Sequence, residues 1–222
     1  MVAAAMTTDG PLRDPTRLGR VAIGTVVAWT VCRAAQLFIF LRAAGPLARA
    51  GATPPGAVLQ HLDEIDRAVF FPILDPLSIF AVLVGACWLY LTSRNAHCLR
   101  PDAVVSPPMT ILWFVVPAAN LFKPFQAVAQ IWRISVSPSA PQDVPTPSPM
   151  RWWWASWLLC NALLCVEGNL ARVAVRPEQQ LLAHWFDVCV FPAEAATALT
   201  FCWLIHRLSA LQRAMAHGAT TG

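Results

Sequence analysis

Residues 109–136 read MTILWFVVPAANLFKPFQAVAQIWRISV, in the middle of a chain of 222 residues. The stretch is apolar enough to enter a bilayer, but prolines and polar residues interrupt it where a plain membrane helix carries leucine or valine: Pro117, Asn120, Lys123, Pro124 and Gln126. Proline removes a backbone donor, and in lipid only protein or water satisfies the carbonyl that is left free. The sequence therefore predicts a broken helical element whose free backbone groups are hydrogen-bonded by neighbouring parts of the protein.

The composition places this element in a membrane protein. Hydrophobic residues make up 57% of the chain and charged residues 13%, with a mean hydropathy of +0.53. The apolar residues gather in blocks of about 17 to 25, the length that a helix needs to cross a bilayer. We therefore predict an all-α integral membrane fold, a small bundle of four to five membrane helices with one broken, re-entrant or interfacial element and a surface amphipathic helix.

Charge and cysteine usage exclude several other classes of protein. The net charge of +4 is spread through the loops without a long basic run, so nucleic acid is not an expected partner. The seven cysteines form no C-x-x-C pair, which favours reduced, packing thiols over a disulfide framework or a zinc site. We expect no metal and no cofactor.

The pattern of apolar blocks predicts the order of segments along the chain. The expected organisation is a mobile N-terminal tail (1–20), a first membrane helix (21–41), an amphipathic helix (58–73), a second membrane helix (76–92), the broken element (109–136), a proline-rich linker (137–149), a pair of C-terminal membrane helices (150–175 and 180–206, within 150–208) and a tail (209–222). Residues 21–136 form one membrane region on this interpretation.

Two features refine the segments near the membrane surface. In the amphipathic helix, His61, Asp63, Glu64 and Asp66 fit metal ligands or a solvated polar face, and the solvated face is the favoured interpretation. Tryptophans at the ends of predicted membrane helices are typical of interfacial anchors; these are Trp88, Trp152, Trp153, Trp154 and Trp157.

The distribution of basic residues predicts the topology. If residues 109–136 cross the membrane, seven basic residues lie on one side and six on the other. If the segment dips in and returns, one side collects ten and the other five, excluding Arg33. The positive-inside rule favours the second arrangement, with four crossings and both termini in the cytoplasm of a bacterial cell.

Ionisable residues within the apolar blocks are candidate site residues, because each requires a partner or a water-filled cavity. Arg33 lies near mid-membrane and is expected to pair with Glu167 or Glu194. The alternative is a proton or substrate path formed by Glu167, Asp187 and Glu194, with His184 at its mouth. No catalytic motif is present in the sequence, so we assign no catalytic residue.

Three groups of motifs resemble a bacterial multi-pass family known as domain of unknown function 4328. They are an aromatic helix end with a following asparagine (Trp88, Leu89, Asn95), the central motif (Trp113, Phe114, Val115, Pro117, Asn120, Leu121, Pro124, Gln126, Ile131, Trp132, Arg133) and a tryptophan-rich helix start (Trp152, Trp153, Trp154, Trp157). Thr92 and Ser93 depart from the first motif. The resemblance implies a membrane location and assigns a structural role to Trp113, Pro117, Asn120, Pro124 and Trp132, but it carries no activity.

The sequence favours a structural or interaction component of the bacterial plasma membrane. The alternatives are a small transporter or channel subunit, with a polar site near Asn95, Asn120, Lys123 and Glu167, and a membrane enzyme that acts on lipid. The expected partners are the lipid bilayer and other membrane proteins or a second copy of the chain.

Overall fold

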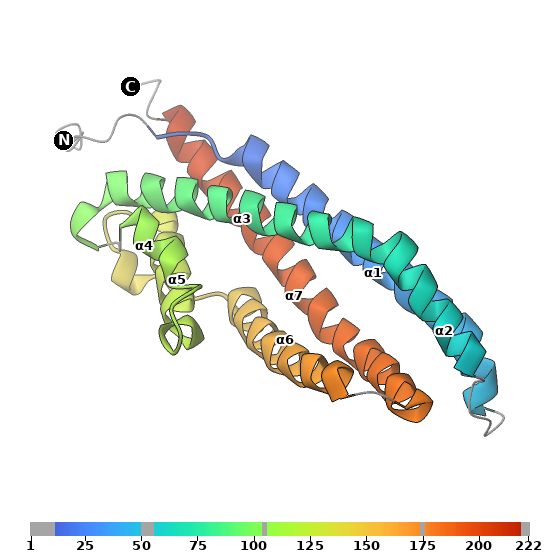
Figure 1. Ribbon diagram of the computed structural model, residues 1–222. Coiled ribbons are helices and arrows are strands. Elements are labelled where there is room, and N and C mark those ends of the chain that lie inside the picture. Colours follow the sequence, from blue (N-terminus) through green and yellow to red (C-terminus); the bar gives the residue numbers. More distant parts are fainter. Residues whose placement is uncertain (1–11, 50–55, 104–105, 174–175, 219–222) are drawn as a thin grey trace. The chain divides into compact units, whose positions relative to one another are not determined.

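The computed structural model describes residues 12–49, 56–103, 106–173 and 176–218 (Figure 1). These residues form helices and no strand, as the sequence predicts. The main helices are α1 (Thr16–Arg49), α2 (Gly56–Ile65), α3 (Phe71–Leu99), α4 (Pro107–Leu112), α5 (Lys123–Val136), α6 (Ser148–Val173) and α7 (Pro177–Gly218). Most of the N-terminal tail predicted for residues 1–20 lies outside the described residues.

Three of the described helical runs are long and apolar enough to cross a membrane, judged by length and composition: Thr16–Pro46, Gly56–Leu99 and Gln179–Gly218. The outer two differ from the predicted boundaries, because α1 already begins at Thr16 and α7 continues to Gly218. Residues 16–20 and 209–218 are therefore helical and do not belong to tails. In both places the helix continues past its apolar block into residues that include polar side chains.

The predicted amphipathic helix and second membrane helix are one continuous helical run. A π-helical turn, Asp66–Phe70, joins α2 to α3, and the Phe71 N–H donates to the Asp66 carbonyl. Pro72 has no N–H for the usual bond to the fourth residue before it, so a wider turn accommodates it. On α2, Leu59 and Leu62 are buried, as the helical spacing predicts.

The break predicted in residues 109–136 is present. Helix α4 ends at Leu112, a short 3-10 helix covers Ala119–Leu121, and α5 begins at Lys123. Between them the Ala119 N–H donates to the Pro117 carbonyl over 2.7 Å. Ala118 has φ 62° and ψ −48°, which together with this bond describes a γ-turn of the rare, strained kind.

Replacing Ala118 by glycine is expected to raise the free energy of unfolding by about 1 kcal/mol, because glycine adopts a positive φ without the steric cost of a Cβ. Unfolding in detergent micelles, followed by circular dichroism, measures the change. The matched control is Ala127→Gly in α5, where the same substitution in a regular helix is expected to lower stability by about 1 kcal/mol. Equal destabilisation by both substitutions would contradict the strain at Ala118.

The contacts between Cα atoms divide the chain into two compact units. Unit 1 comprises Met1–Gly24, Ala81–Trp154 and Thr200–Gly222, and unit 2 comprises Thr25–Phe80 and Ala155–Leu199. Helices α4 and α5 lie wholly in unit 1.

Unit 1 has an aromatic core. Trp132 stacks on Trp203 with ring centroids 5.7 Å apart, and Trp153 stacks on Phe201 at 5.7 Å. Trp88 is fully buried, and its indole N–H donates to Ser209 Oγ over 3.0 Å. The predicted interfacial role therefore does not hold for Trp88, Trp153 or Trp154, which are buried, whereas Trp152 is 68% exposed. The buried rings are surrounded by other side chains of unit 1 and not by lipid headgroups.

Helices α1 and α7 approach each other closely in unit 1. A Cβ added to Gly19 would lie 2.7 Å from Ser209 Oγ and 3.1 Å from Ile205 Cγ2. Since both neighbours are themselves buried, a larger residue at position 19 requires the two helices to move apart. The absent side chain of Gly19 thus sets the spacing of the first turns of α1 and the last turns of α7.

Unit 2 has a smaller apolar core beside its charged residues. Phe40, Ala44 and Leu62 form one buried cluster, against which Trp185 and Val188 pack. A second cluster joins Cys160 on α6 to Val190 and Ala193 on α7. These contacts align the polar faces of α1 and α7 within the unit.

Candidate functional site

Arg33 is the centre of a buried charged group in unit 2. Its Nε donates to Glu194 Oε2 over 3.3 Å, one terminal nitrogen donates to Gln36 Oε1 over 2.6 Å and to Asp187 Oδ2 over 3.3 Å, and the other donates to Asp187 Oδ1. The side chains of Arg33, Asp187 and Glu194 are 11%, 15% and 5% exposed. We call these residues, Arg33, Gln36, Asp187 and Glu194, the Arg33 cluster.

Helix geometry explains why two carboxylates meet one guanidinium. Asp187 and Glu194 are seven residues apart on α7, which places them on one face about two turns apart. Arg33 and Gln36 are three residues apart on α1 and also share a face. The planar guanidinium presents five N–H donors in a fork, so it engages Asp187 bidentately and Glu194 at the same time.

A second pair of polar contacts extends from the Arg33 cluster toward α2. Gln36 hydrogen-bonds the carboxylate of Asp66, and His184 Nε2 lies 3.1 Å from Asp63 Oδ1. The ring of Phe40 stacks on His184, with centroids 5.1 Å apart. Asp63 and Asp66 thus face α1 and α7, whereas His61 and Glu64 keep the solvated position predicted for them, with side chains 72% and 58% exposed.

Glu167 on α6 is the candidate that stays outside the ion pairs. It is close enough to the Arg33 cluster for electrostatic interaction, but its Oε2 is buried without a hydrogen-bond partner among the described residues. The predicted pairing of Arg33 therefore holds for Glu194 and not for Glu167. Asp187 takes the second position, because it lies on the same face of α7 as Glu194.

Asn95 belongs to a separate buried network in unit 1. Its Nδ2 donates to Gln212 Oε1 over 2.9 Å and to the Arg13 carbonyl over 2.7 Å, and its Oδ1 accepts the Arg13 N–H over 3.1 Å. Gln212 Nε2 donates to the Thr92 carbonyl and to Ser135 Oγ, each over 3.0 Å. Asn95 and Gln212 are each 1% exposed. Other groups of the protein satisfy the hydrogen-bonding capacity of both amides, which indicates that the network stabilises the packing of these helices.

Asn120 and Lys123 lie at the break before α5. Lys123 Nζ is 5.9 Å from the ring centroid of Trp113 and 5.9 Å from that of Phe122, so the aromatic faces stabilise its charge. Asn120 Oδ1 is buried without a partner among the described residues. Backbone bonds hold the bend, including the Asn120 N–H to the Val116 carbonyl over 2.9 Å.

Sequence reasoning missed Gln36 and Gln212. Gln36 follows Arg33 by three residues inside an apolar block, and two polar residues at that spacing on a membrane helix are a detectable signal of a shared buried face. Gln212 lies beyond the predicted end of the last membrane helix, in the predicted C-terminal tail. Its role depends on the approach of α3 to α7 in unit 1, which no local pattern reports.

Comparison with models of known protein families gives a match. A family model described as "Domain of unknown function (DUF4328)" matches residues 64–210. The matched region includes α3 to α6 and most of α7, with Asn95, Asn120, Glu167, Asp187 and Glu194, and it begins after Arg33. Searches of curated proteins and of solved structures gave no match.

Proposed function

This chain belongs to the family of domain of unknown function 4328, and we propose that it is a multi-pass protein of the bacterial plasma membrane that acts as a structural or interaction component. The closed Arg33 cluster is the observation that carries the structural role. The guanidinium makes four hydrogen bonds, and three carboxylate or amide side chains of α1 and α7 surround it. These bonds engage four of the five N–H donors of the guanidinium, so the group holds α1 to α7 and keeps little donor capacity for a substrate.

The membrane location is supported by a pattern of burial opposite to that of a soluble protein, with apolar side chains exposed and charged side chains buried. Large apolar residues are more than half exposed on the long helices, such as Val31, Phe38, Val82 and Leu199, while Arg33 and Glu194 are turned inward. Water would penalise such an exposed apolar surface, whereas lipid accepts it.

The charge of the two units supports four crossings. Unit 1 contains ten basic and four acidic residues, a net charge of +6, and unit 2 contains six basic and eight acidic residues, a net charge of −2. The ten basic residues of unit 1 are those that the positive-inside rule groups on the cytoplasmic side when residues 109–136 do not cross. Four helical runs (α1, α2 with α3, α6 and α7) divide between the units, whereas α4 and α5 do not.

Maleimide labelling of intact cells tests this topology. A cysteine introduced at exposed Ser139 is expected to react with a membrane-impermeant reagent only after the cells are permeabilised, whereas one introduced at Arg176 is expected to react in intact cells. The parent chain measures the background of its own cysteines. Labelling of Ser139→Cys from outside would contradict the four-crossing arrangement.

Transport is the second candidate, because buried Glu167 Oε2 has no partner among the described residues and lies near the Arg33 cluster. Proteoliposomes loaded with a pH-sensitive dye separate the two functions. On the structural proposal, proteoliposomes with the parent chain or with Glu167→Gln show the proton leak of lipid alone. A leak that the parent chain increases and Glu167→Gln abolishes, at equal protein abundance, would favour transport.

A further inference from the structure

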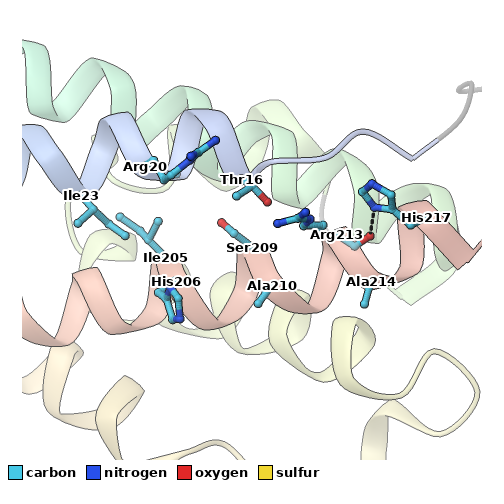
Figure 2. A pocket seen from close by; sticks show the side chains of 11 residues that line it. Thr16, Arg20, Ile23, Ile205, His206, Ser209, Ala210, Arg213, Ala214 and His217 are labelled. Atoms are coloured by element: carbon cyan, nitrogen blue, oxygen red, sulfur yellow. Dashed lines mark hydrogen bonds between the residues drawn. The ribbon is translucent and has the colours of Figure 1, made fainter.

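The first turns of α1 and the last turns of α7 enclose a groove in unit 1 with a volume of about 380 Å³. Figure 2 shows Arg20 on α1 and Arg213 on α7, with Thr16 and Ser209 between them. The remaining lining residues are Gly19, Ile23, Ile205, His206, Ala210, Ala214 and His217. None of them belongs to the Arg33 cluster or to the Asn95 network.

The lining changes in polarity along the groove. Ile23 and Ile205 line the part that is furthest along α1 from its start, whereas Arg213 and His217 line the part near the end of α7. On α1 the residues Thr16, Gly19, Arg20 and Ile23 follow the spacing of one helix face. The groove is therefore basic toward the helix termini and apolar toward the interior of the two apolar helices.

The arginines of the groove are weakly neutralised. Arg20 makes no ion pair within the described part of the chain, and Arg213 has Asp14, whose Oδ2 is 4.0 Å from its Nε. Burial raises the pKa of the Asp14 carboxyl, but the hydrogen bonds from Thr16 and the charges of Arg213 and His217 together outweigh burial, so the pKa is lowered. Asp14 is thus ionised at neutral pH and offsets one of the two arginine charges.

We propose that this groove binds the phosphate headgroup of an anionic phospholipid between Arg20 and Arg213, with the start of an acyl chain along Ile23 and Ile205. Arginine pairs well with phosphate oxygens, and basic pockets between membrane helices on the cytoplasmic side are suited to anionic headgroups. The net charge of +6 in unit 1 attracts the same lipids. This inference rests on the proposed membrane location.

Native mass spectrometry of the full chain in neutral detergent tests the site, with equal amounts of phosphatidylglycerol and phosphatidylcholine. The parent chain is expected to retain phosphatidylglycerol preferentially. We expect each arginine to contribute about a fivefold preference for phosphatidylglycerol over phosphatidylcholine. The double variant Arg20→Gln with Arg213→Gln is therefore expected to lower this preference about 25-fold. The matched control is Arg17→Gln with Arg207→Gln, which removes two exposed charges from the same helices outside the groove.

Two further variants sharpen the result. Asp14→Asn keeps an oxygen that accepts the Thr16 N–H but removes the competing charge, so retention of phosphatidylglycerol is expected to rise severalfold. Arg20→Lys with Arg213→Lys keeps the charge and is expected to retain most of the lipid preference even if the glutamine variant does not fold. Preference lost equally in the control pair, or unchanged in the glutamine variant, would overturn the site.

Competition by inorganic phosphate distinguishes a lipid from a free anion. Phosphatidylglycerol retention that persists in millimolar phosphate supports the lipid, and complete displacement overturns it. Alkaline carbonate extraction of native membranes tests the proposed location independently: release of the chain would reject the membrane location itself, whereas retention in the membrane without lipid preference would reject only the groove.

Discussion

Replacing Arg33 by methionine is expected to lower the free energy of unfolding by about 3 to 5 kcal/mol, because it leaves Asp187 and Glu194 buried as uncompensated charges. The loss is large compared with the 5 to 15 kcal/mol that is typical of a whole folded protein. Titration of the purified chain from neutral detergent into SDS, followed by tryptophan fluorescence, measures it. Folded protein recovered from membranes is expected to fall in parallel.

The controls separate charge from packing. Arg42→Met removes an exposed arginine from the same helix and is expected to change stability by less than about 0.5 kcal/mol. Combining Arg33→Met with Asp187→Leu and Glu194→Leu removes the ion pairs as a set and is expected to recover most of the loss, since apolar replacement of a buried ion pair is often neutral or stabilising. If Arg33→Met alone is as stable as the parent chain, the cluster does not hold α1 to α7.

Replacing Asn95 by leucine is expected to cost about 2 to 4 kcal/mol of unfolding free energy. The substitution removes the donor to Gln212 Oε1, whose side chain is buried, and it releases both backbone groups of Arg13. Leaving a buried polar group unsatisfied costs about 1 to 3 kcal/mol. The same SDS titration measures the loss.

The Asn95 prediction has a matched control and a coupling test. Asn169→Leu removes an exposed amide whose Nδ2 donates to the Cys165 carbonyl of its own helix, and it is expected to change stability by less than about 0.5 kcal/mol. Asn95→Leu with Gln212→Leu is expected to cost less than the sum of the single substitutions, because the two amides share a bond. Strictly additive losses would show that Asn95 and Gln212 act independently.

The break before α5 could be predicted from the sequence because its cause is local. Pro117 and Pro124 lack the backbone donors that a continuous helix needs, and the structure has a turn after Leu112 and a new helix from Lys123. The particular turn at Ala118 could not be predicted, because alanine gives no signal of a positive φ. Local chemistry therefore located the bend without describing its geometry.

The candidate site was predicted in part. The cost of burying charge in an apolar helix made Arg33, Asp187 and Glu194 candidates, and the structure joins all three. Which carboxylates pair with Arg33 depends on how the helices are rotated relative to one another. The sequence does not report this rotation, so Glu167 on α6 is an equally suitable partner by sequence alone. Trp88 shows the same limit, since an indole ring suits a membrane interface and a protein core equally well, and only packing against α7 decided between them.

The sequence by itself determined the helical class, the long apolar runs and the position of the break, because each depends on backbone hydrogen bonding and hydrophobicity within a short window. Only the tertiary structure decided that Arg33 meets Asp187 as well as Glu194, that Asn95 meets Gln212, and that α1 and α7 form a basic groove. These contacts join residues more than a hundred positions apart, and their geometry depends on how helices rotate and pack against one another.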